Sequence, residues 1–451
     1  MIAKSPDYHA LEQGRETVSA LFAAALSAVE PNRAVRAAIG FCDGMMVVGG
    51  SSIDVTHGLH IVAIGKAAVA MARGVVEALP GVVISGDVIT VEGHESGTLP
   101  ESIQVHEAGH PIPDLRGLRA TQEMLRCLGM LGPDAVVLAL ISGGGSALME
   151  ATREGISLTD LATTTDLLLR AGAPIDVLNA VRAPLSKVKS GGLRAAVPSA
   201  AWVTLILSDV LGNDPRIIAS GPTVRGETNS EMALSHIDRY ALRDRLPKNV
   251  LQILVKGEDE RTEVHVEEDI LSIIGDNAMA IEAAASTAQS LGLNATIAWK
   301  AMQGEAAFLG REFVSLVTEA SDAIAVVLGG GEATVTVRGV GRGGRNTEFA
   351  LAAALELERR RAYDWVVASL GTDGQDAMTG LAGAIADGGT ADRARRQGVD
   401  PECALHQNDS ATVFDIAGGT VKTGPTGTNV NDLYIAVRIP ERNEDISQGG
   451  N

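Results

Sequence analysis

The sequence predicts an α/β protein of two lobes with largely parallel sheets. Apolar runs of strand length alternate with longer segments of helical pattern over most of the chain, which is typical of parallel βαβ units. The chain has 451 residues, and at about 150 residues per domain this length indicates two or three domains. Apolar residues make up 45% of the chain, which is enough to bury a large core.

The first half of the chain begins with an Ala- and Leu-rich segment at 9–45 that predicts a helix. After it, short apolar runs that end at glycine or polar residues predict strands, and the stretches between them predict helices. The predicted strands are 60–64, 83–90, 103–107, 135–141 and 201–207. The predicted helices are 69–78, a helix from about 115, 158–171 and 175–182.

The second half resumes the alternation after a charged segment at 256–268, KGEDERTEVHVEE, which is the best linker candidate. The predicted strands are 271–275, 294–299, 323–328, 333–338 and 365–370. The predicted helices are 278–291, 303–320 and 346–360. We therefore expect an N-terminal α/β domain over residues 1–258 and a C-terminal α/β lobe over residues 265–445.

The segment LALISGGGSALM at 138–149 carries the strongest local signal. An apolar strand stops at Ser142, and three glycines and Ser146 lead into residues that favour a helix. Successive glycines let the backbone approach a ligand closely, and a helix N-terminus favours negative charge. The segment predicts a turn that binds phosphate or carboxylate, with a merely flexible turn as the alternative. A second triple glycine, at 329–331, also follows an apolar run and predicts the same device in the second lobe.

Charged residues and hydroxyls follow several other predicted strands, and ligands of open α/β sheets bind outside the carboxyl ends of the strands. Lys66 can bring a positive charge to a phosphate, although a solvated surface lysine is the alternative. Asp209 and Asp373 each end an apolar strand and are candidate metal ligands, with helix capping as the alternative. The candidate cofactor-binding residues are Ser142, Gly143, Gly144, Gly145, Ser146, Lys189, Gly330, Gly331, Glu332, Thr372, Asp373 and Gly374.

The segment RGVGRGGRNTE at 338–348 places Arg345 among glycines just before a predicted helix. A guanidinium suits the bidentate capture of a carboxylate or phosphate, and a basic flexible loop is the alternative. Gly339, Gly341 and Gly344 also match the GxGxxG pattern of dehydrogenases. That match lacks the acidic residue expected at the end of the following strand, and no GxxxxGK[ST] motif occurs anywhere in the chain.

Composition excludes some classes of partner. The net charge is −19 and aromatic residues are only 3%, which argues against binding to a nucleic acid. No uncharged apolar run is long enough to span a membrane. The three cysteines are scattered, which favours a reducing, cytoplasmic compartment over a disulfide framework. We expect a soluble enzyme or binding protein with a small-molecule ligand.

Together these segments resemble the class II glycerate kinases, the D-glycerate 2-kinase family with a C-terminal MOFRL domain. The similar stretches run in order over most of the chain. They are GKAAVAMARG (65–74), EAGHPIPD (107–114), ISGGGSALM (141–149), LSKVKSGGL (185–193), SDVLGNDPRIIASGPT (208–223), GGGEATVTVRGVGRGGRNTEFAL (329–351), LGTDGQDAMTGLAGAIADG (370–388) and TGPTGTNVNDL (423–433).

The resemblance implies a Rossmann-like N-terminal lobe, a C-terminal MOFRL lobe and an active site in the cleft. It also implies ATP-dependent, Mg²⁺-assisted phosphorylation of D-glycerate, usually to 2-phosphoglycerate. Lys66 and Arg345 match the family's proposed catalytic pair, and the SGGGSA loop resembles its phosphate-binding turn. We assign catalytic roles to Lys66, Arg345 and Asp209, and we expect Asp209 or Asp373 to hold the metal.

The chain departs from the family before Leu185, where relatives commonly have a basic residue and a histidine, whereas here Arg182 is followed by Ala183 and Pro184. It departs again at Ser190, where a glycine is usual. These departures predict an acceptor site that tolerates other hydroxy acids. Two other functions stay open: an NAD(P)H-dependent hydroxypyruvate reductase that uses the 339–344 glycines, and a non-catalytic sensor of a nucleotide or sugar acid. The sequence also leaves open whether the chain forms a homodimer.

Overall fold

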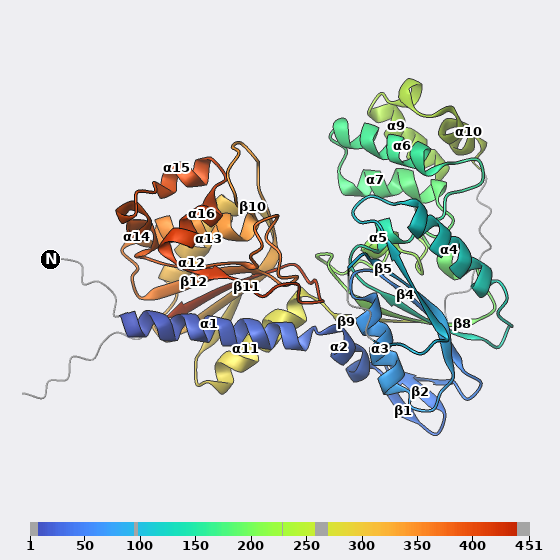
Figure 1. Cartoon of the computed structure of the whole chain (residues 1–451), viewed down its shortest axis with the longest axis horizontal. Helices are drawn as coiled ribbons and strands as arrows, with labels where there is room; N and C mark the ends of the chain where they lie inside the picture. Colours follow the sequence, from blue (N-terminus) through green and yellow to red (C-terminus); the bar gives the residue numbers. More distant parts are fainter. Residues whose placement is uncertain (1–7, 94–97, 228, 258–268, 440–451) are drawn as a thin grey trace, which may run out of the picture. The chain divides into compact units, whose positions relative to one another are not determined.

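The computed structural model describes residues 8–93, 98–227, 229–257 and 269–439. Their contacts divide the chain into two compact units. Residues 30–276 form one, called here the N-terminal unit, and residues 1–29 with 277–451 form the other, called here the C-terminal unit (Figure 1). Residues 258–268 of the predicted linker lie outside the described residues.

A parallel sheet of six strands forms the centre of the N-terminal unit, with the order β6-β5-β4-β7-β8-β9. Counted along the chain this order is 3-2-1-4-5-6, the order of a Rossmann fold, so the parallel sheet predicted for this lobe is confirmed. The strands are β4 (Leu59–Ile64), β5 (Ile84–Val91), β6 (Ile103–Ala108), β7 (Val136–Ile141), β8 (Ala201–Leu207) and β9 (Ile270–Gly275).

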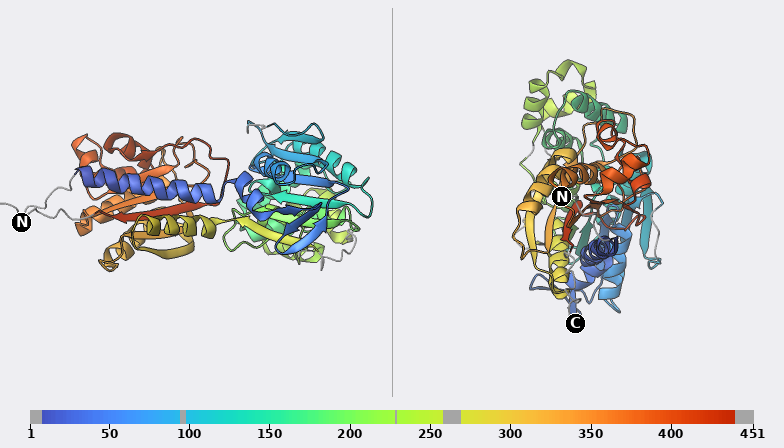
Figure 2. Two further views of the ribbon diagram at one scale, coloured as in Figure 1. Left: turned by 90° about the horizontal axis from the view of Figure 1, so that it is seen from below. Right: turned by 90° about the vertical axis from the view of Figure 1, so that its left-hand side faces the viewer.

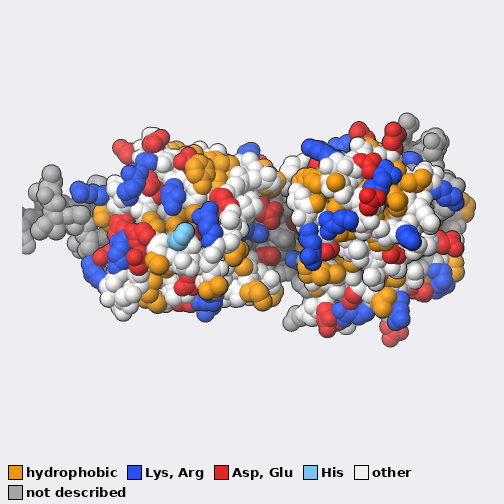
Figure 3. Space-filling model, turned by 90° about the horizontal axis from the view of Figure 1, so that it is seen from above, with side chains coloured by type: hydrophobic (Ala, Val, Ile, Leu, Met, Phe, Trp, Pro, Cys, Tyr) orange, Lys and Arg blue, Asp and Glu red, His pale blue; other side chains and the backbone are white. Residues whose placement is uncertain are grey.

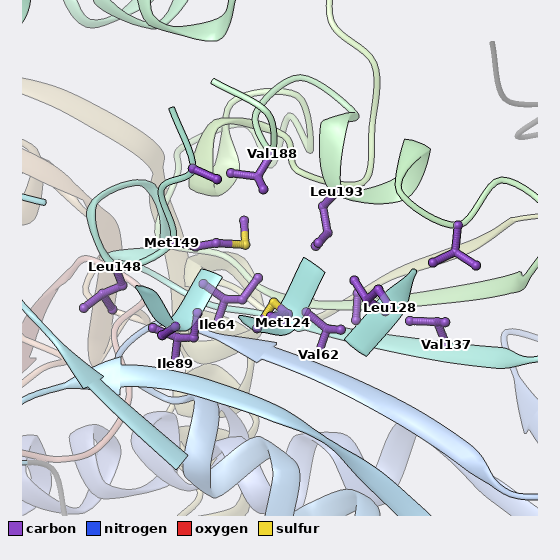
Figure 4. Close-up of a cluster of buried hydrophobic side chains, with 14 of the residues drawn as sticks. Val62, Ile64, Ile89, Met124, Leu128, Val137, Leu148, Met149, Val188 and Leu193 are labelled. Atoms are coloured by element: carbon purple, nitrogen blue, oxygen red, sulfur yellow. The ribbon is translucent and has the colours of Figure 1, made fainter. Parts of the chain in front are cut away.

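Every residue of β4 and β7 is buried, as expected for central strands of a parallel sheet covered by helices. α3 (Ala68–Ala78) packs against β4 and β5, and α4 (Leu115–Leu128) packs against β5 and β6. Figure 4 shows the core that α4 shares with the sheet, where Met124 lies near Val62 and Ile64. Leu148 belongs to the same core, so the segment that follows the first triple glycine is anchored in it.

Four further helices of the N-terminal unit pack around a separate apolar core, which includes Leu161, Leu178 and Leu254. They are α6 (Leu158–Arg170), α7 (Ile175–Arg182), α9 (Ser230–Arg239) and α10 (Lys248–Lys256). Short helical turns complete this unit. They are α5 (Gly145–Leu148), η1 (Ala183–Leu185), α8 (Gly192–Ala195), η2 (Ile218–Ser220) and η3 (Arg243–Arg245).

The single helix predicted over 9–45 is wrong in its second half. α1 (Tyr8–Ala28) ends before Pro31, which begins the separate helix α2 (Pro31–Ala38) because proline fits the first helical turn. An antiparallel sheet follows, made of β1 (Gly40–Cys42), β2 (Met45–Val48) and β3 (Ser51–Asp54).

The sheet of the C-terminal unit is mixed, so the prediction of a largely parallel sheet is wrong for this lobe. Its order is β10-β11-β15-β12-β13-β14, and within the described residues only β10 and β11 pair in parallel. The last strand of the chain enters between β11 and β12 and runs antiparallel to both. The strands are β10 (Ala295–Glu305), β11 (Val326–Thr334), β12 (Trp365–Gly371), β13 (Gly383–Asp387), β14 (Thr420–Val421) and β15 (Asp432–Arg438).

Helices cover both faces of this mixed sheet (Figures 1 and 2). α12 (Ala306–Glu319) and α13 (Arg345–Arg360) pack together on one face, and α1 and α11 (Asn277–Ser290) pack together on the other. α1 thus belongs with the C-terminal unit, whereas the predicted boundaries grouped it with the N-terminal domain. Three short helices pack around α13, namely α14 (Thr390–Arg396), α15 (Pro401–His406) and α16 (Ser410–Ala417).

The second triple glycine does not form a turn. Gly329–Gly331 lie inside β11 and pair with β10 on one side and β15 on the other. A Cβ at Gly330 would lie 2.0 Å from Asn277 Oδ1, and a Cβ at Gly331 would lie 2.0 Å from the carbonyl oxygen of Met302. The glycines are required here because neighbouring groups approach the strand closely. The predicted turn and the separate strand at 333–338 are therefore wrong, whereas the cofactor contact predicted for Gly330, Gly331 and Glu332 stays a prediction.

The surface carries charged side chains of both signs (Figure 3). On the face drawn in Figure 3, acidic and basic side chains are interspersed and form no broad basic patch. In the part of the chain that the structure describes, no helix is both long and apolar enough to cross a membrane.

Candidate active site

The turns after β4 and β7 lie side by side at the carboxyl edge of the parallel sheet. The strand order reverses between these two neighbours, which is where sheets of this kind bind ligands. The Ser142 N–H donates to the Ile64 carbonyl at 2.9 Å, and the Lys66 N–H donates to the Gly143 carbonyl at 2.9 Å. The Ser142 hydroxyl accepts from the Ala67 N–H at 3.1 Å. The fold thus brings together Lys66 and the first triple glycine, which the sequence identified separately.

The glycines of this turn allow other groups to approach its backbone. Gly144 has a left-handed backbone with φ of +87°, which favours glycine. A Cβ at Gly143 would lie 2.2 Å from Asp209 Oδ2, and a Cβ at Gly145 would lie 2.8 Å from the Cβ of Ala219. The carboxylate of Asp209 therefore lies against the turn. The helix that follows, α5, is only 4 residues long, so the predicted contribution of a helix dipole is not supported.

Lys66 and His110 line the other side of the turn. A Cβ at Gly144 would lie 3.4 Å from Lys66 Cγ and 3.1 Å from His110 Cδ2. Partial burial, together with the Lys66 ammonium, lowers the pKa of His110. The backbone of the turn is thus flanked by a cation, an imidazole and the Asp209 carboxylate, which is the chemistry that a phosphate with a divalent cation needs.

Lys189 supports this turn from the protein interior. Its side chain is 1% exposed and its Nζ lies 3.2 Å from Glu150 Oε2. Its Nζ also donates to the carbonyl of Ser146 at 2.8 Å. Burial lowers the pKa of Lys189 to about 8, although the Glu150 carboxylate opposes that effect. These contacts are with protein groups, so the cofactor contact predicted for Lys189 stays a prediction.

Ser190 shows why a glycine is usual at its position. Its φ is +50°, a left-handed backbone conformation that residues other than glycine rarely adopt. Its hydroxyl accepts a hydrogen bond from the Gly226 N–H at 2.9 Å, which helps to hold this conformation. Ala183 and Pro184, the other departures, are buried in η1 next to Arg182.

A second candidate site lies within the C-terminal unit, around Arg345 at the start of α13. A pocket of about 670 Å³ is lined by Arg345, Glu332 and Gly344 among others. The Arg345 guanidinium forms two hydrogen bonds to Asp432, at 2.6 and 3.0 Å, and its Nη1 lies 3.3 Å from Glu332 Oε1. These contacts hold the guanidinium in a fixed orientation, and because Arg345 is partly exposed, the group lies at the surface of this pocket.

Asp432 is the residue that orients Arg345, and the sequence analysis missed it. Its side chain is completely buried, and Asn346 Nδ2 donates to Asp432 Oδ1 at 3.0 Å. Burial raises the pKa of Asp432 to about 6, while Arg345 acts in the opposite direction. The acidic residue at the end of the TNVND segment was the available signal, but the sequence does not show which cation it faces.

The predicted residues 372–374 form a tight turn after β12. Thr372 is buried, and its hydroxyl donates to the Asn431 carbonyl at 2.7 Å, so it shapes the turn. A Cβ at Gly374 would lie 2.0 Å from the Gly424 carbonyl oxygen, which requires glycine. Asp373 is partly buried and accepts from the Gln375 N–H at 2.9 Å. Its metal-binding role stays a prediction.

The GxGxxG segment does not form the strand–turn–helix of a dinucleotide fingerprint. β11 ends at Thr334, well before Gly339. A Cβ at Gly339 would lie 2.3 Å from the Gln407 carbonyl oxygen, and a Cβ at Gly341 would lie 2.4 Å from the Cβ of Asp409. These glycines allow close packing of the loop against residues 407–409.

Neither site is a ready-made metal centre. Among the residues that the structure describes, no three His, Cys, Asp or Glu side chains are grouped closely enough to hold a metal. Mg²⁺ in phosphoryl-transfer sites needs only one or two carboxylates beside the phosphates, which Asp209 could supply.

Comparisons with known proteins agree over most of the chain. The family model described as "Domain of unknown function (DUF4147)" matches residues 17–255, and the MOFRL family model matches residues 325–432. A glycerate 2-kinase of Pyrococcus horikoshii is 38% identical over 95% of this chain and 98% of its own length. A protein of Agrobacterium vitis named putative hydroxypyruvate reductase is 41% identical over 83% of this chain and 85% of its own.

A solved structure shows the same similarity in three dimensions. The crystal structure of a glycerate kinase from Thermotoga maritima is similar with a TM-score of 0.85 and 34% identity. That similarity covers 95% of this chain and 100% of the crystallised one.

Proposed function

Because this chain belongs to the glycerate kinase family of DUF4147 and MOFRL domains, we propose that it transfers the terminal phosphoryl group of ATP to D-glycerate and forms 2-phospho-D-glycerate. The relative named glycerate 2-kinase supports this choice of product. The observation that carries the proposal is the glycine turn after β7, which lies between Lys66 and Asp209 at the reversal of the strand order.

Phosphoryl transfer depends mainly on positioning and on the stabilisation of charge. In the proposal, the phosphates lie against the backbone of Gly143–Gly145, next to the Asp209 carboxylate that the missing Cβ of Gly143 allows to approach. Lys66 provides a compact positive charge for the transferred group, and its backbone is fixed by the hydrogen bond to Gly143.

The residues at this turn suit Mg²⁺. The carboxylate of Asp209 occupies the space that a Cβ at Gly143 would fill, and hard oxygen ligands are what Mg²⁺ prefers. Asp209 would hold Mg²⁺ at this turn, and the cation would supply positive charge that offsets the charge of the phosphates. Asp209 is therefore the proposed ligand in the N-terminal unit, and Asp373 is the weaker candidate in the C-terminal unit.

Arg345 is the proposed catalytic residue of the C-terminal unit. Its bidentate pairing with Asp432 fixes the plane of the guanidinium, and its partial exposure leaves it accessible to an anion. Family membership implies use of a nucleotide, and an arginine directed at the transferred group is a recurring part of such enzymes.

A hydroxypyruvate reductase is the competing proposal, since some relatives carry that name. The packed glycines at 339 and 341 give it no support. In the Rossmann-like sheet, the first βα turn would carry the dinucleotide fingerprint, but residues 65–68 here are Gly-Lys-Ala-Ala. We therefore favour the kinase.

The deciding assay measures two products from the same purified protein. We expect release of ADP from ATP that requires both D-glycerate and Mg²⁺, and no oxidation of NADH with hydroxypyruvate. Oxidation of NADH without formation of ADP would replace the kinase by the reductase, and failure of both reactions would favour the sensor.

A further inference from the structure

A second group of buried charges lies on the interior side of the glycine turn. It consists of Arg182, Lys189 and Glu150, and the Glu150 carboxylate acts electrostatically on both cations. Lys189 forms the ion pair with Glu150 at 3.2 Å. Within the described residues Arg182 has no ion pair, so two cations share one carboxylate. The mechanism proposed above makes no use of Arg182.

Arg182 is also incompletely satisfied by hydrogen bonds. Its Nη2 donates to the carbonyl of Ser146 at 3.3 Å, but its Nε is buried and has no hydrogen-bond partner among the described residues. Burial lowers the pKa of Arg182, while the Glu150 carboxylate acts in the opposite direction. A buried donor without a partner destabilises the protein, and a bound anion that accepts from it would remove this cost.

Ser146, whose carbonyl Arg182 contacts, also carries a hydroxyl that lies close to a second one. The hydroxyls of Ser146 and Ser220 are 2.6 Å apart, and Ser220 Oγ lies 3.5 Å from Asn179 Oδ1. Ala219 and Ser220 both have left-handed backbones, with φ of +50° and +64°. Strained backbones of this kind are concentrated at ligand sites, because the surrounding structure must hold them in place. The contact with the Ser146 hydroxyl holds the Ser220 hydroxyl against the turn.

We propose that Arg182, with the hydroxyls of Ser146 and Ser220, binds the carboxylate of the acceptor and is thereby the residue that selects hydroxy acids. This inference rests on the proposed function, because it assigns the acceptor side of the same glycine turn. The backbone N–H of Lys66 donates to the Gly143 carbonyl and Arg182 Nη2 donates to the Ser146 carbonyl, so the two residues contact opposite ends of the turn.

A carboxylate fits this place better than a nucleotide phosphate does. Within the described part of the chain, Arg182 keeps an unused donor at Nε, next to its Nη2. A planar guanidinium suits the two oxygens of one carboxylate, whereas the phosphates of ATP carry several charges and need more than one cation.

The test compares D-glycerate with its methyl ester, which lacks the charge, in Arg182→Gln and Arg182→Lys. We expect Arg182→Gln to raise the KM for D-glycerate about 10- to 100-fold, the range for loss of a hydrogen bond to a charged group, while the KM for ATP changes less than about threefold. The preference of the wild type for the acid over the ester should disappear in Arg182→Gln and persist in part in Arg182→Lys. Arg170→Gln, on the exposed face of α6, is the matched control and should leave the preference unchanged.

Calorimetry of D-glycerate without ATP separates this inference from the proposed function. Binding that is lost in Arg182→Gln supports the inference even if no phosphoryl transfer occurs. Phosphorylation of D-glycerate with unchanged KM and unchanged ester discrimination in Arg182→Gln overturns the inference and leaves the kinase standing. A rise in the KM for ATP instead would mean that Arg182 binds the nucleotide. If Arg182→Gln does not fold, the kinetic test uses Arg182→Lys. The melting temperature of the wild type is then also measured with D-glycerate and with its methyl ester, and equal increases for the two compounds overturn the inference.

Discussion

The two triple glycines of this chain have the same composition and opposite roles. Gly143–Gly145 leave the parallel sheet and form a turn beside Lys66 and Asp209. Gly329–Gly331 stay inside β11, between two paired strands. Both need glycine because a side chain would collide with a neighbour. The comparison teaches that a run of glycines indicates that another group lies close to the backbone, and does not by itself indicate a turn or a ligand. The identity of that neighbouring group decides the function.

The approaching groups differ in kind. Asp209, a partly exposed carboxylate, approaches the first triplet, whereas the buried amide of Asn277 approaches the second. Asn277 Nδ2 donates to the carbonyls of Val430 and Asp432 at 2.8 and 3.0 Å, so it ties α11 to the strand end. We therefore propose that the first triplet belongs to the active site, and we attribute the second to the packing of the sheet.

The largest expected effect comes from removal of the proposed catalytic cations, Lys66 in the N-terminal unit and Arg345 in the C-terminal unit. Lys66→Ala and Arg345→Ala should each lower kcat by a factor of about 10³, because both charges are proposed to act on the transferred group. Lys66→Ala should keep its stability, whereas Arg345→Ala leaves the buried Asp432 without its ion pair and should lower the melting temperature. Steady-state kinetics and circular dichroism check both. Near-wild-type kcat in either variant removes that residue from the catalytic set.

An alanine substitution in each triplet tests directly whether the two triplets differ in function. Gly143→Ala should displace Asp209 and lower kcat about 100-fold with a small loss of stability. Gly330→Ala should lower the free energy of unfolding by about 1–3 kcal/mol, because Asn277 cannot move without losing its hydrogen bonds, and should change kcat little. Urea unfolding and kinetics on both variants provide the test. If the folded Gly330→Ala protein has a much lower kcat than the wild type, the second triplet also contacts a ligand.

Asp209→Asn sharpens the assignment of the first triplet. The variant keeps the shape of the side chain but loses its charge, so the concentration of Mg²⁺ needed for half-maximal rate should rise by about 10- to 100-fold. A titration of rate against Mg²⁺ at saturating ATP measures this. Asp373→Asn is the control in the C-terminal unit. Should Asp373→Asn and not Asp209→Asn shift the titration, the metal ligand lies in the C-terminal unit.

The smallest expected effect is a dependence on pH that belongs to the C-terminal unit. The pKa of Asp432 is raised to about 6, so Asp432 becomes neutral as pH falls through that value and releases its hold on Arg345. We expect kcat to fall by up to about tenfold per pH unit below pH 6. In Asp432→Asn the rate should be low and this acid limb should be absent. An unchanged limb in that variant assigns the titration to another group.

The N-terminal unit was largely predictable because its elements follow local rules. β4, β7 and β8 are short apolar runs that end in polar turns, and they lie within one residue of the predicted ranges. Their parallel order follows from the alternation with helices. Lys66, Gly143–Gly145 and Asp209 could be selected because the carboxyl ends of parallel strands share one edge.

The C-terminal unit was less predictable because its sheet depends on distant partners. β15 lies between β11 and β12, and the sequence of residues 326–334 does not indicate which strands pair with β11. The pairing of Arg345 with Asp432 likewise joins residues 87 positions apart, and a single acidic residue does not reveal its cation. Arg182 was not among the predicted site residues, because its unpartnered Nε exists only in the folded chain.

The central claim is that this chain phosphorylates D-glycerate with ATP, and nuclear magnetic resonance of the product tests it most directly. Incubation of the purified protein with D-glycerate, ATP and Mg²⁺ should give one new phosphate monoester whose phosphorus couples to the proton on the second carbon, which identifies 2-phospho-D-glycerate. Coupling to the protons of the third carbon would identify the 3-phosphate and contradict the proposed position. The absence of any phosphate ester, with NADH oxidised by hydroxypyruvate instead, would contradict the kinase itself.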